Sequence, residues 1–417
     1  MRNLWRLAAA AGLLLSFGLR PGYAADLPDP WVELDADGVL ALRVVVPAGA
    51  KCPAALADGV AVAMQPRTSA DSRFSIVVCE GHAPPASARL TVDDIAVPSL
   101  APQIQRIAVI GDTGCRLKGR VVQDCNDPLS WPFSTVARRA AARKPDLVIH
   151  VGDYHYRESA CPAGRPGCAG TPFGDNWPVW KLDFFDPAAP LLAAAPWVFA
   201  RGNHEDCHRA ASGWFRLLDP HPAMPAACPD LTEPFALRLG GLTLLMFDSA
   251  AADDDAVQPA SLPAYSGALS RLLAGAPPQS WIVTHRPFWA LNQGLGIPFS
   301  RTVNATEQAA SRGQPLAAVD LVLSGHVHDF ASYGFGPERP AQLVVGDGGD
   351  LTDALLQPVV PGRVIDGMPI VKGFGLQRFG YFIFERAEDG WSGTLFGLDD
   401  AVLAQCRLRG RDLDCGQ

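Results

Sequence analysis

The amino-acid sequence predicts an α/β protein that carries a small all-β domain on its N-terminal side. From about residue 30 to 100, short apolar runs alternate with turn residues, and no helical pattern interrupts them. After residue 104, five short runs are almost continuously apolar, which is typical of strands buried on both faces of a sheet. Because helical stretches lie between some of these runs, the second part is predicted to be α/β.

The first 24 residues are predicted to be a cleavable secretory signal. Arg2 and Arg6 precede an apolar stretch at residues 7–19, and Gly22 and Ala24 supply small residues before the cleavage point. The alternative is a transmembrane anchor, but this stretch is too short to cross a hydrocarbon core about 30 Å thick. We therefore expect a secreted or periplasmic protein without a stable membrane anchor.

All ten cysteines follow the predicted signal, which indicates disulfide bonds formed in an oxidising compartment. No CxxC pair is present, so a structural zinc site is not expected. The sequence alone does not fix the connectivity. The most economical pairing joins neighbours along the chain: Cys52 with Cys79, Cys115 with Cys125, Cys161 with Cys168, Cys207 with Cys228, and Cys406 with Cys415.

The predicted β domain covers residues 25–103. Its strands are expected at 39–46, 60–64, 74–79 and 89–92. A linker with two prolines, residues 96–102, ends the domain.

The predicted α/β domain covers residues 104–417. Its buried strands are expected at 106–110, 147–151, 197–200, 281–284 and 321–324. Helices are predicted at 135–143, where Ser134 would be the N-cap, and at 261–273. A hairpin and a closing antiparallel pair are expected at 233–247, 380–385 and 393–398.

Each of the five buried strands is followed by side chains that commonly bind metals. In chain order these are Asp112, Asp153 with Tyr156, Asn203, His285, and His326 with His328. Ligands in α/β sheets bind beyond the carboxyl ends of the strands, so these positions suit a site. The mixture of oxygen and imidazole donors suits iron, zinc or manganese. Seven ligands are too many for one tetrahedral zinc ion, and they suit two neighbouring ions that share a bridging carboxylate.

The motifs GDTG (111–114), GDYHY (152–156), GNHE (202–205) and GHVH (325–328), with a strand-end histidine before the last, resemble the calcineurin-like metallophosphoesterase superfamily. The resemblance covers about residues 104–350 and implies a four-layer α/β/β/α sandwich. The general superfamily has a histidine where this chain has Gly114, whereas purple acid phosphatases have a tyrosine where Tyr156 stands. The sequence is therefore most similar to the purple acid phosphatases, and GDGG at 346–349 also resembles a segment of that family.

The resemblance implies two metal ions and assigns ligands to each. The first ion would take Asp112, Asp153, Tyr156 and His328, and the second would take Asp153 as a bridge with Asn203, His285 and His326. A tyrosinate favours Fe(III) in the first site, with iron, zinc or manganese in the second. His204 matches the position that the family uses to bind phosphate and to protonate the leaving group, and a metal-activated hydroxide would be the nucleophile.

The segment after the fourth motif departs from the family pattern. Residues 286–292 contain none of the histidines with which family members hold the substrate. Arg286 and Asn292 are candidates for that role, and Arg201 is a further candidate for contacts with phosphate oxygens. Both arginines are equally compatible with structural ion pairs. The missing histidines leave open the preference for monoesters and for acid pH.

The formal net charge of −8 argues against nucleic acid as the main partner, because polyanion binding needs a basic surface. A small phosphate ester is compatible with this charge, since bound cations reverse the local field. The run of three aspartates at 253–255 lacks the spacing of a calcium loop and is predicted to be a solvated turn. We predict an acid phosphatase-like phosphoric ester hydrolase. The alternatives are a phosphodiesterase or nucleotide-specific hydrolase and, less favoured, a non-catalytic phosphoester-binding protein; the oligomeric state is not predicted.

Overall fold

The computed structural model describes residues 27–222, 224–292, 301–302, 304–353 and 359–417. The predicted signal peptide at residues 1–24 lies outside the described residues, and so does the side chain of Asn292. Within the described ranges, no helix is both long and apolar enough to cross a membrane.

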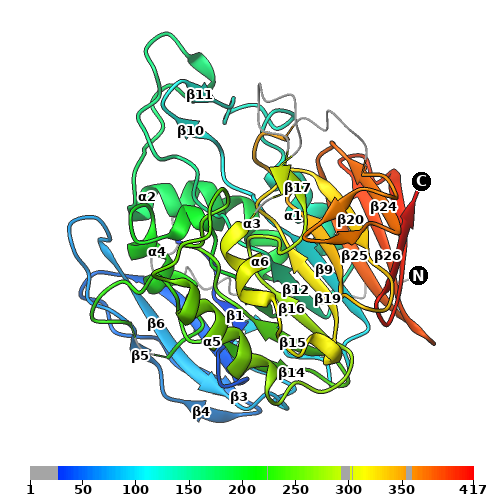
Figure 1. Ribbon diagram of the computed structural model, residues 1–417. Helices are drawn as coiled ribbons and strands as arrows, with labels where there is room; N and C mark the ends of the chain where they lie inside the picture. The colour runs from blue at the N-terminus through cyan, green and yellow to red at the C-terminus, as the bar shows by residue number, and fades with distance from the viewer. Residues whose placement is uncertain (1–26, 223, 293–300, 303, 354–358) are drawn as a thin grey trace, which may run out of the picture.

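The fold has four layers, in which two β-sheets face each other and helices cover their outer faces (Figure 1). The larger sheet has 11 strands. Their spatial order is β28 (Asp412–Gly416), β27 (Val402–Arg409), β26 (Gly390–Gly397), β25 (Gly380–Ala387), β9 (Arg106–Ile110), β12 (Leu147–His150), β13 (Trp197–Phe199), β1 (Trp31–Leu34), β2 (Leu40–Pro47), β6 (Ile76–Ala83) and β5 (Gln65–Pro66). The smaller sheet has seven strands. Their order is β14 (Phe235–Arg238), β15 (Thr243–Met246), β16 (Ser280–Val283), β19 (Val319–Ser324), β21 (Ala341–Val345), β20 (Phe330–Gly334) and β24 (Lys372–Leu376).

The helices divide between the two outer faces. The larger sheet is covered by α1 (Phe133–Ala142), α2 (Trp177–Trp180), α3 (Asp186–Leu192) and α4 (Ala211–Leu217). A π-helical turn, Lys181–Phe185, joins α2 to α3. The smaller sheet is covered by α5 (Leu262–Leu273) and α6 (Ala305–Ser311). This arrangement is the α/β/β/α sandwich that the resemblance implied.

Strand β9 shows why the central strands are apolar throughout. Ile107 and Val109 point into the core between the two sheets, while Ala108 and Ile110 point into the core under the helices. Because successive side chains of a strand point to opposite faces, a strand covered on both sides needs apolar residues at every position. The neighbouring strands β12 and β13 run parallel to β9, so their carboxyl ends meet at one edge of the sheet.

The N-terminal residues contain only strands, as the sequence predicts, and four of these strands extend the larger sheet. Strand β1 pairs in parallel with β13, β2 pairs with β1, and β6 pairs with β2 and β5. The other four form a separate sheet in the order β4 (Val60–Val62), β3 (Ala55–Ala57), β7 (Leu90–Val92) and β8 (Ile95–Val97). The N-terminal segment therefore shares its hydrophobic core with the rest of the chain.

Three two-stranded ribbons, four short 3-10 or π segments and five disulfides complete the described structure. The ribbons are β10 (Leu117–Lys118) with β11 (Val121–Val122), β17 (Leu291–Asn292) with β18 (Arg301–Thr302), and β22 (Val364–Ile365) with β23 (Met368–Pro369). The 3-10 turns are Pro166–Cys168, Asn203–Glu205 and Leu316–Ala318. All five predicted disulfide pairs are present.

The predicted N-cap at Ser134 is wrong. Helix α1 begins at Phe133, and the backbone amides of Thr135 and Val136 bond to the carbonyl oxygen of Pro132. Ser134 therefore lies inside the first turn, where its side chain cannot cap the helix. The other predicted helix, α5, begins one residue after the predicted start and ends at the predicted residue.

Candidate metal centre

Loops from the carboxyl ends of five strands meet between the two sheets. The larger sheet contributes the loops after β9, β12 and β13, and the smaller sheet contributes those after β16 and β19. The structure brings together all seven residues that the sequence predicted as ligands. Their ligand-type atoms form two groups that share the carboxylate of Asp153.

The first group surrounds the phenol oxygen of Tyr156. This oxygen lies 3.1 Å from Asp112 Oδ1, 2.7 Å from Asp153 Oδ2 and 3.0 Å from His328 Nε2. His328 Nε2 in turn lies 3.4 Å from Asp112 Oδ1. Four ligand-type atoms of Asp112, Asp153, Tyr156 and His328 therefore face one common point.

The second group surrounds the side-chain oxygen of Asn203. His285 Nε2 lies 2.9 Å from Asn203 Oδ1, and His326 Nδ1 lies 2.8 Å from the same atom. His285 Nε2 is also 3.3 Å from Asp153 Oδ2, which belongs to the first group as well. Asp153 Oδ2 therefore lies close to atoms of both groups.

These separations fit metal ions. With metal–ligand bonds of about 2.0–2.2 Å, ligands at about 90–110° to each other lie about 2.8–3.6 Å apart. The distances above run from 2.7 to 3.4 Å. Two carboxylates, a phenol, an amide oxygen and three imidazoles are donors that iron, zinc and manganese accept. The residues of both groups therefore fit a pair of such ions.

Three of the seven residues adopt the left-handed backbone conformation. The φ angle is 55° at Asp112, 61° at Asp153 and 71° at His326. This conformation costs about 1–2 kcal/mol for a residue with a side chain, and such strain gathers at functional sites. Gly202 allows the close approach of the neighbouring loop, since a Cβ atom there would lie 2.1 Å from Asp153 Oδ1.

Glu205 joins the second and third motif loops. One carboxylate oxygen accepts hydrogen bonds from the amides of Tyr154 (2.9 Å) and His155 (3.1 Å). The other accepts from the amides of Gly202 (3.1 Å) and Asp153 (3.2 Å). Burial and the charge of Asp153 raise the pKa of Glu205 to about 8. The four backbone amides nevertheless donate to oxygen lone pairs and so favour the ionised carboxylate of Glu205. A cation held by Asp153 would also offset the repulsion between the negative charges of Asp153 and Glu205.

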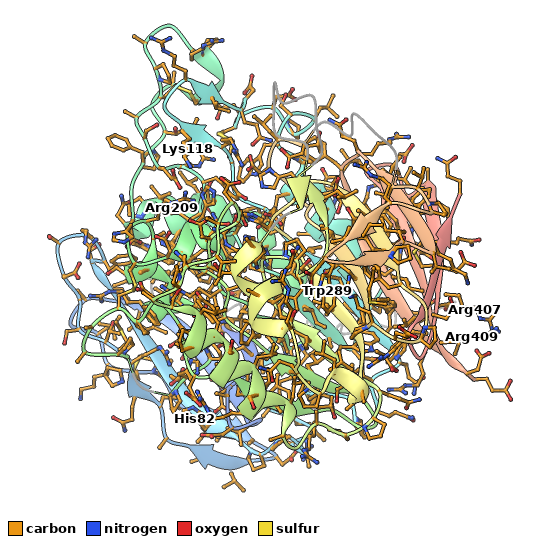
Figure 2. All side chains as sticks on the ribbon, viewed as in Figure 1. His82, Lys118, Arg209, Trp289, Arg407 and Arg409 are labelled. Atoms are coloured by element: carbon orange, nitrogen blue, oxygen red, sulfur yellow. A yellow bond between two sulfur atoms is a disulfide. The ribbon has the colours of Figure 1, made fainter. Side chains whose placement is uncertain are left out.

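His204 lies beside the shared carboxylate. Its Nε2 is 3.8 Å from Asp153 Oδ2, and its ring centre is 3.9 Å from that of Tyr156. On the far side, its Nδ1 is 2.8 Å from Glu158, whose carboxylate also lies near Arg209 (3.6 Å) and Lys118 (3.8 Å). Burial opposes the ionisation of Glu158, but His204 and the two cations outweigh it and lower the pKa of Glu158 to about 2. Figure 2 shows Lys118 and Arg209 on the same side of the molecule.

The ion pair of Arg116 with Asp350 lies next to the phenol of Tyr156. The guanidinium of Arg116 is 5.0 Å from the centre of the Tyr156 ring and binds Asp350 with its Nε at 2.8 Å. Asp350 is 3.4 Å from His328 Nδ1. Burial raises the pKa of Tyr156 well above its ordinary value, and the carboxylates of Asp153 and Asp112 raise it further. Burial and these carboxylates therefore favour the neutral phenol, whereas a nearby cation would favour the phenolate.

The structure separates the three predicted phosphate contacts. Arg201 is buried, and its guanidinium binds the carbonyl oxygens of Glu205 and Pro229 and the carboxylate of Asp248. These contacts support the alternative of a structural ion pair for Arg201. Arg286 lies at the second group, 2.5 Å from Asp254 Oδ2. The side chain of Asn292 falls outside the described residues.

The prediction of a solvated turn at residues 253–255 is wrong for Asp254. Its carboxylate lies 2.9 Å from His326 Nε2 as well as 2.5 Å from Arg286. The fold places the loop after β15 against the loops after β16 and β19, and the sequence contains no signal of that proximity. Glu158 and Arg116 were also not predicted from the sequence. Neither residue follows a buried strand directly, so the strand-end pattern did not point to them.

Comparisons with known proteins agree with the geometry. Residues 105–330 match the model of the calcineurin-like phosphoesterase family. Among solved structures, purple acid phosphatase PPD1 from yellow lupin (Lupinus luteus) seeds is similar with a TM-score of 0.52 at 12% identity, covering 93% of this chain and 73% of that one. A structure of PhoD is similar with a TM-score of 0.52 at 13% identity, covering 95% and 94%. At these identities the likeness concerns the fold alone. No curated protein matches the sequence.

Proposed function

The chain belongs to the calcineurin-like phosphoesterase family, and from this membership we propose that it is an exported hydrolase of phosphate esters with a two-metal centre. The observation that carries the proposal is the convergence of seven ligand-type side chains into two groups that share Asp153. A scaffold that had lost catalysis would not need both groups to be complete. Two bound ions would polarise the phosphoryl group and supply an activated water as the nucleophile.

We assign Asp112, Asp153, Tyr156 and His328 to the first ion, and Asp153, Asn203, His285 and His326 to the second. The phenol of Tyr156 favours Fe(III) in the first site, because a trivalent ion stabilises a phenolate best. Arg116 supports the same assignment, since its positive charge above the ring also favours the phenolate. Iron, zinc or manganese suits the nitrogen-rich second site.

His204 is the proposed general acid. Its Nε2 faces the shared carboxylate of Asp153, while its Nδ1 lies 2.8 Å from Glu158 Oε1. When the Nδ1 proton is held by a carboxylate, the Nε2 atom is the one free to deliver a proton to a leaving oxygen. Glu158 is therefore proposed to orient His204 rather than to contact the substrate.

A small phosphate ester is the proposed substrate, and nucleic acid is not proposed as the main partner. Export is supported by five disulfides, which persist in oxidising compartments. The periplasm and the extracellular space are both such compartments.

The test is hydrolysis by the metal-loaded full chain. We expect release of p-nitrophenol from p-nitrophenyl phosphate or from its bis-ester, and the ratio of the two rates separates a monoesterase from a diesterase. Asp153→Ala should abolish both activities, because it removes a ligand of both ions. Asp389→Ala is the control, since Asp389 is exposed and pairs with Arg407 and Arg409, two side chains that Figure 2 shows at the edge of the molecule. Full activity in Asp153→Ala would refute the proposed mechanism.

Tyrosinate ligation has its own test. Protein loaded with iron should show a visible charge-transfer band that disappears in Tyr156→Phe. A colourless iron-loaded protein with full activity would rule out a ferric tyrosinate in the first site.

A further inference from the structure

The imidazole of His326 lies between two oxygen atoms. Its Nδ1 is 2.8 Å from Asn203 Oδ1, inside the second ligand group, and its Nε2 is 2.9 Å from Asp254 Oδ2. A neutral imidazole carries one proton, and a nitrogen that binds a metal must not carry it. If Nδ1 faces the ion, the proton is on Nε2, which can then donate a hydrogen bond to Asp254 but not to Arg286 Nη1, a donor 3.0 Å from the same nitrogen. Asp254 is therefore placed to select the tautomer that can bind a metal.

Asp254 is itself held firmly. Its carboxylate receives the Arg286 guanidinium at 2.5 Å, and its carbonyl oxygen accepts a hydrogen bond from the amide of Ala305 at the start of α6. The backbone amide of Arg286 donates to Ser249 Oγ at 2.8 Å, which fixes the loop from which the arginine extends. Burial opposes the ionisation of Asp254, but His326 and Arg286 outweigh it and lower the pKa of Asp254 below its ordinary value.

The position of Arg286 also bears on substrate binding. Its side chain is only 11% exposed, and its charge is matched by a carboxylate within hydrogen-bond distance. A guanidinium that is already paired attracts a phosphate less strongly than a free one, because the net charge of the pair is zero. The guanidinium therefore has a partner in Asp254, its Nη1 also lies 3.0 Å from His326 Nε2, and its Nε has no hydrogen-bond partner among the described residues.

We propose that Asp254 is a positioning residue for the second metal site, and that Arg286 acts by holding Asp254 rather than by binding the phosphoryl group. The inference rests on the proposed two-metal centre and adds to it a residue from a loop that carries none of the seven ligands. Carboxylates that accept a hydrogen bond from the free N–H of a ligating histidine fix its ring and raise its basicity. Their loss lowers metal affinity by about 10–100-fold.

The experiment measures metal binding and does not depend on turnover. The metal-free full chain is titrated with Zn²⁺ by calorimetry, and two binding events are expected. Asp254→Ala should weaken one event about 10–100-fold and leave the other unchanged. Asp254→Asn keeps an oxygen acceptor for His326 Nε2, so it should lose less than Asp254→Ala. Asp253→Asn is the control, because it removes the same charge from the adjacent residue and should change neither event.

The role of Arg286 is tested with inorganic phosphate. Arg286→Met should lower the zinc affinity of the same binding event that Asp254→Ala weakens, as Asp254→Asn does. Phosphate bound to the fully loaded variant should keep a dissociation constant within about threefold of the wild type. A loss of phosphate affinity greater than tenfold, with metal binding unchanged, would overturn the assignment and make Arg286 a phosphate contact.

The remaining outcomes are also decisive. Unchanged zinc binding in Asp254→Ala would overturn the proposal. If that variant does not fold, the Asp254→Asn and Arg286→Met titrations decide in its place. A wild-type chain that binds no second ion would overturn the inference together with the two-metal centre. A chain that binds two ions but hydrolyses no phosphate ester would overturn the proposed function alone.

Discussion

Glu205 offers a strong test of how the metal centre is built. Its carboxylate accepts four backbone hydrogen bonds, two at each oxygen, from the loops after β12 and β13. In Glu205→Gln one oxygen becomes an NH₂ group, so two backbone amides face a donor instead of an acceptor. Each buried polar group without a partner costs about 1–3 kcal/mol, so the variant should lose about 2–6 kcal/mol of unfolding free energy. This is a large share of the roughly 5–15 kcal/mol that stabilises a typical domain.

The loss is measured by urea denaturation followed through tryptophan fluorescence. Glu233→Gln is the matched control, because Glu233 is 69% exposed and its pair with Arg271 lies at the surface. An exposed pair contributes at most about 1 kcal/mol, so the control should change little. Metal affinity should fall in Glu205→Gln, since the amides of Asp153 and Gly202 lose their fixed position. An unfolding free energy within 1 kcal/mol of the wild type, with unchanged metal binding, would refute this account of the loops.

Three further predictions concern stability and metal content. Chelation should lower the unfolding free energy, by about 2.7 kcal/mol for each ion present at 100 times its dissociation constant, and Asp153→Asn should lose most of this metal dependence; equal thermal stability with and without chelator would contradict it. Gly202→Ala should reduce the bound metal below two ions per chain in elemental analysis, because the new Cβ would lie 2.1 Å from Asp153 Oδ1; a full complement of metal would contradict the assigned geometry. His221→Gln should show a pH-dependent loss of stability. Burial alone would lower the pKa of His221, but its bond to Asp219 outweighs burial and raises it above 6.5, so its contribution is complete below pH 6.5 and disappears as the pH rises through the folded-state value. Denaturation at about pH 5.5 and about pH 9 checks this, and an equal loss at both would contradict the ion pair.

The sequence predicted the parts of the fold that depend on local pattern. Strand β9 was predicted to the residue, because both of its faces are covered and its apolar run is uninterrupted. The convergence of the candidate ligand residues was predictable for a related reason, since they follow such runs directly at the carboxyl ends of the strands. Sequence proximity also predicted the disulfides, whose cysteines are neighbours along the chain.

The features that depend on distant neighbours were not predictable in this way. Nothing in Trp31–Leu34 indicates that it pairs with Trp197, yet this pairing joins the N-terminal strands to the larger sheet. Asp254 stands in a run of acids that resembles any exposed turn, and its partner His326 is 72 residues away. Glu158 and Arg116 likewise reach His204 and Tyr156 only because the loops that carry them meet in the fold. The domain boundary near residue 103 stays a prediction.

The two ligand groups draw on both sheets, and this has a consequence for how the protein matures. Asp112, Asp153 and Asn203 come from the larger sheet, while His285 and His326 come from the smaller one, so neither sheet alone can complete the second group. The larger sheet also pairs Val109 with Phe382, and such distant pairings make folding slow. Metal uptake is therefore expected to come last, after the sheets have docked. If the proposed two-metal centre forms, a chain that stalls before this point would have no activity and would lack the resistance to unfolding and proteolysis that bound ions provide, so we expect metal loading to report that folding is complete.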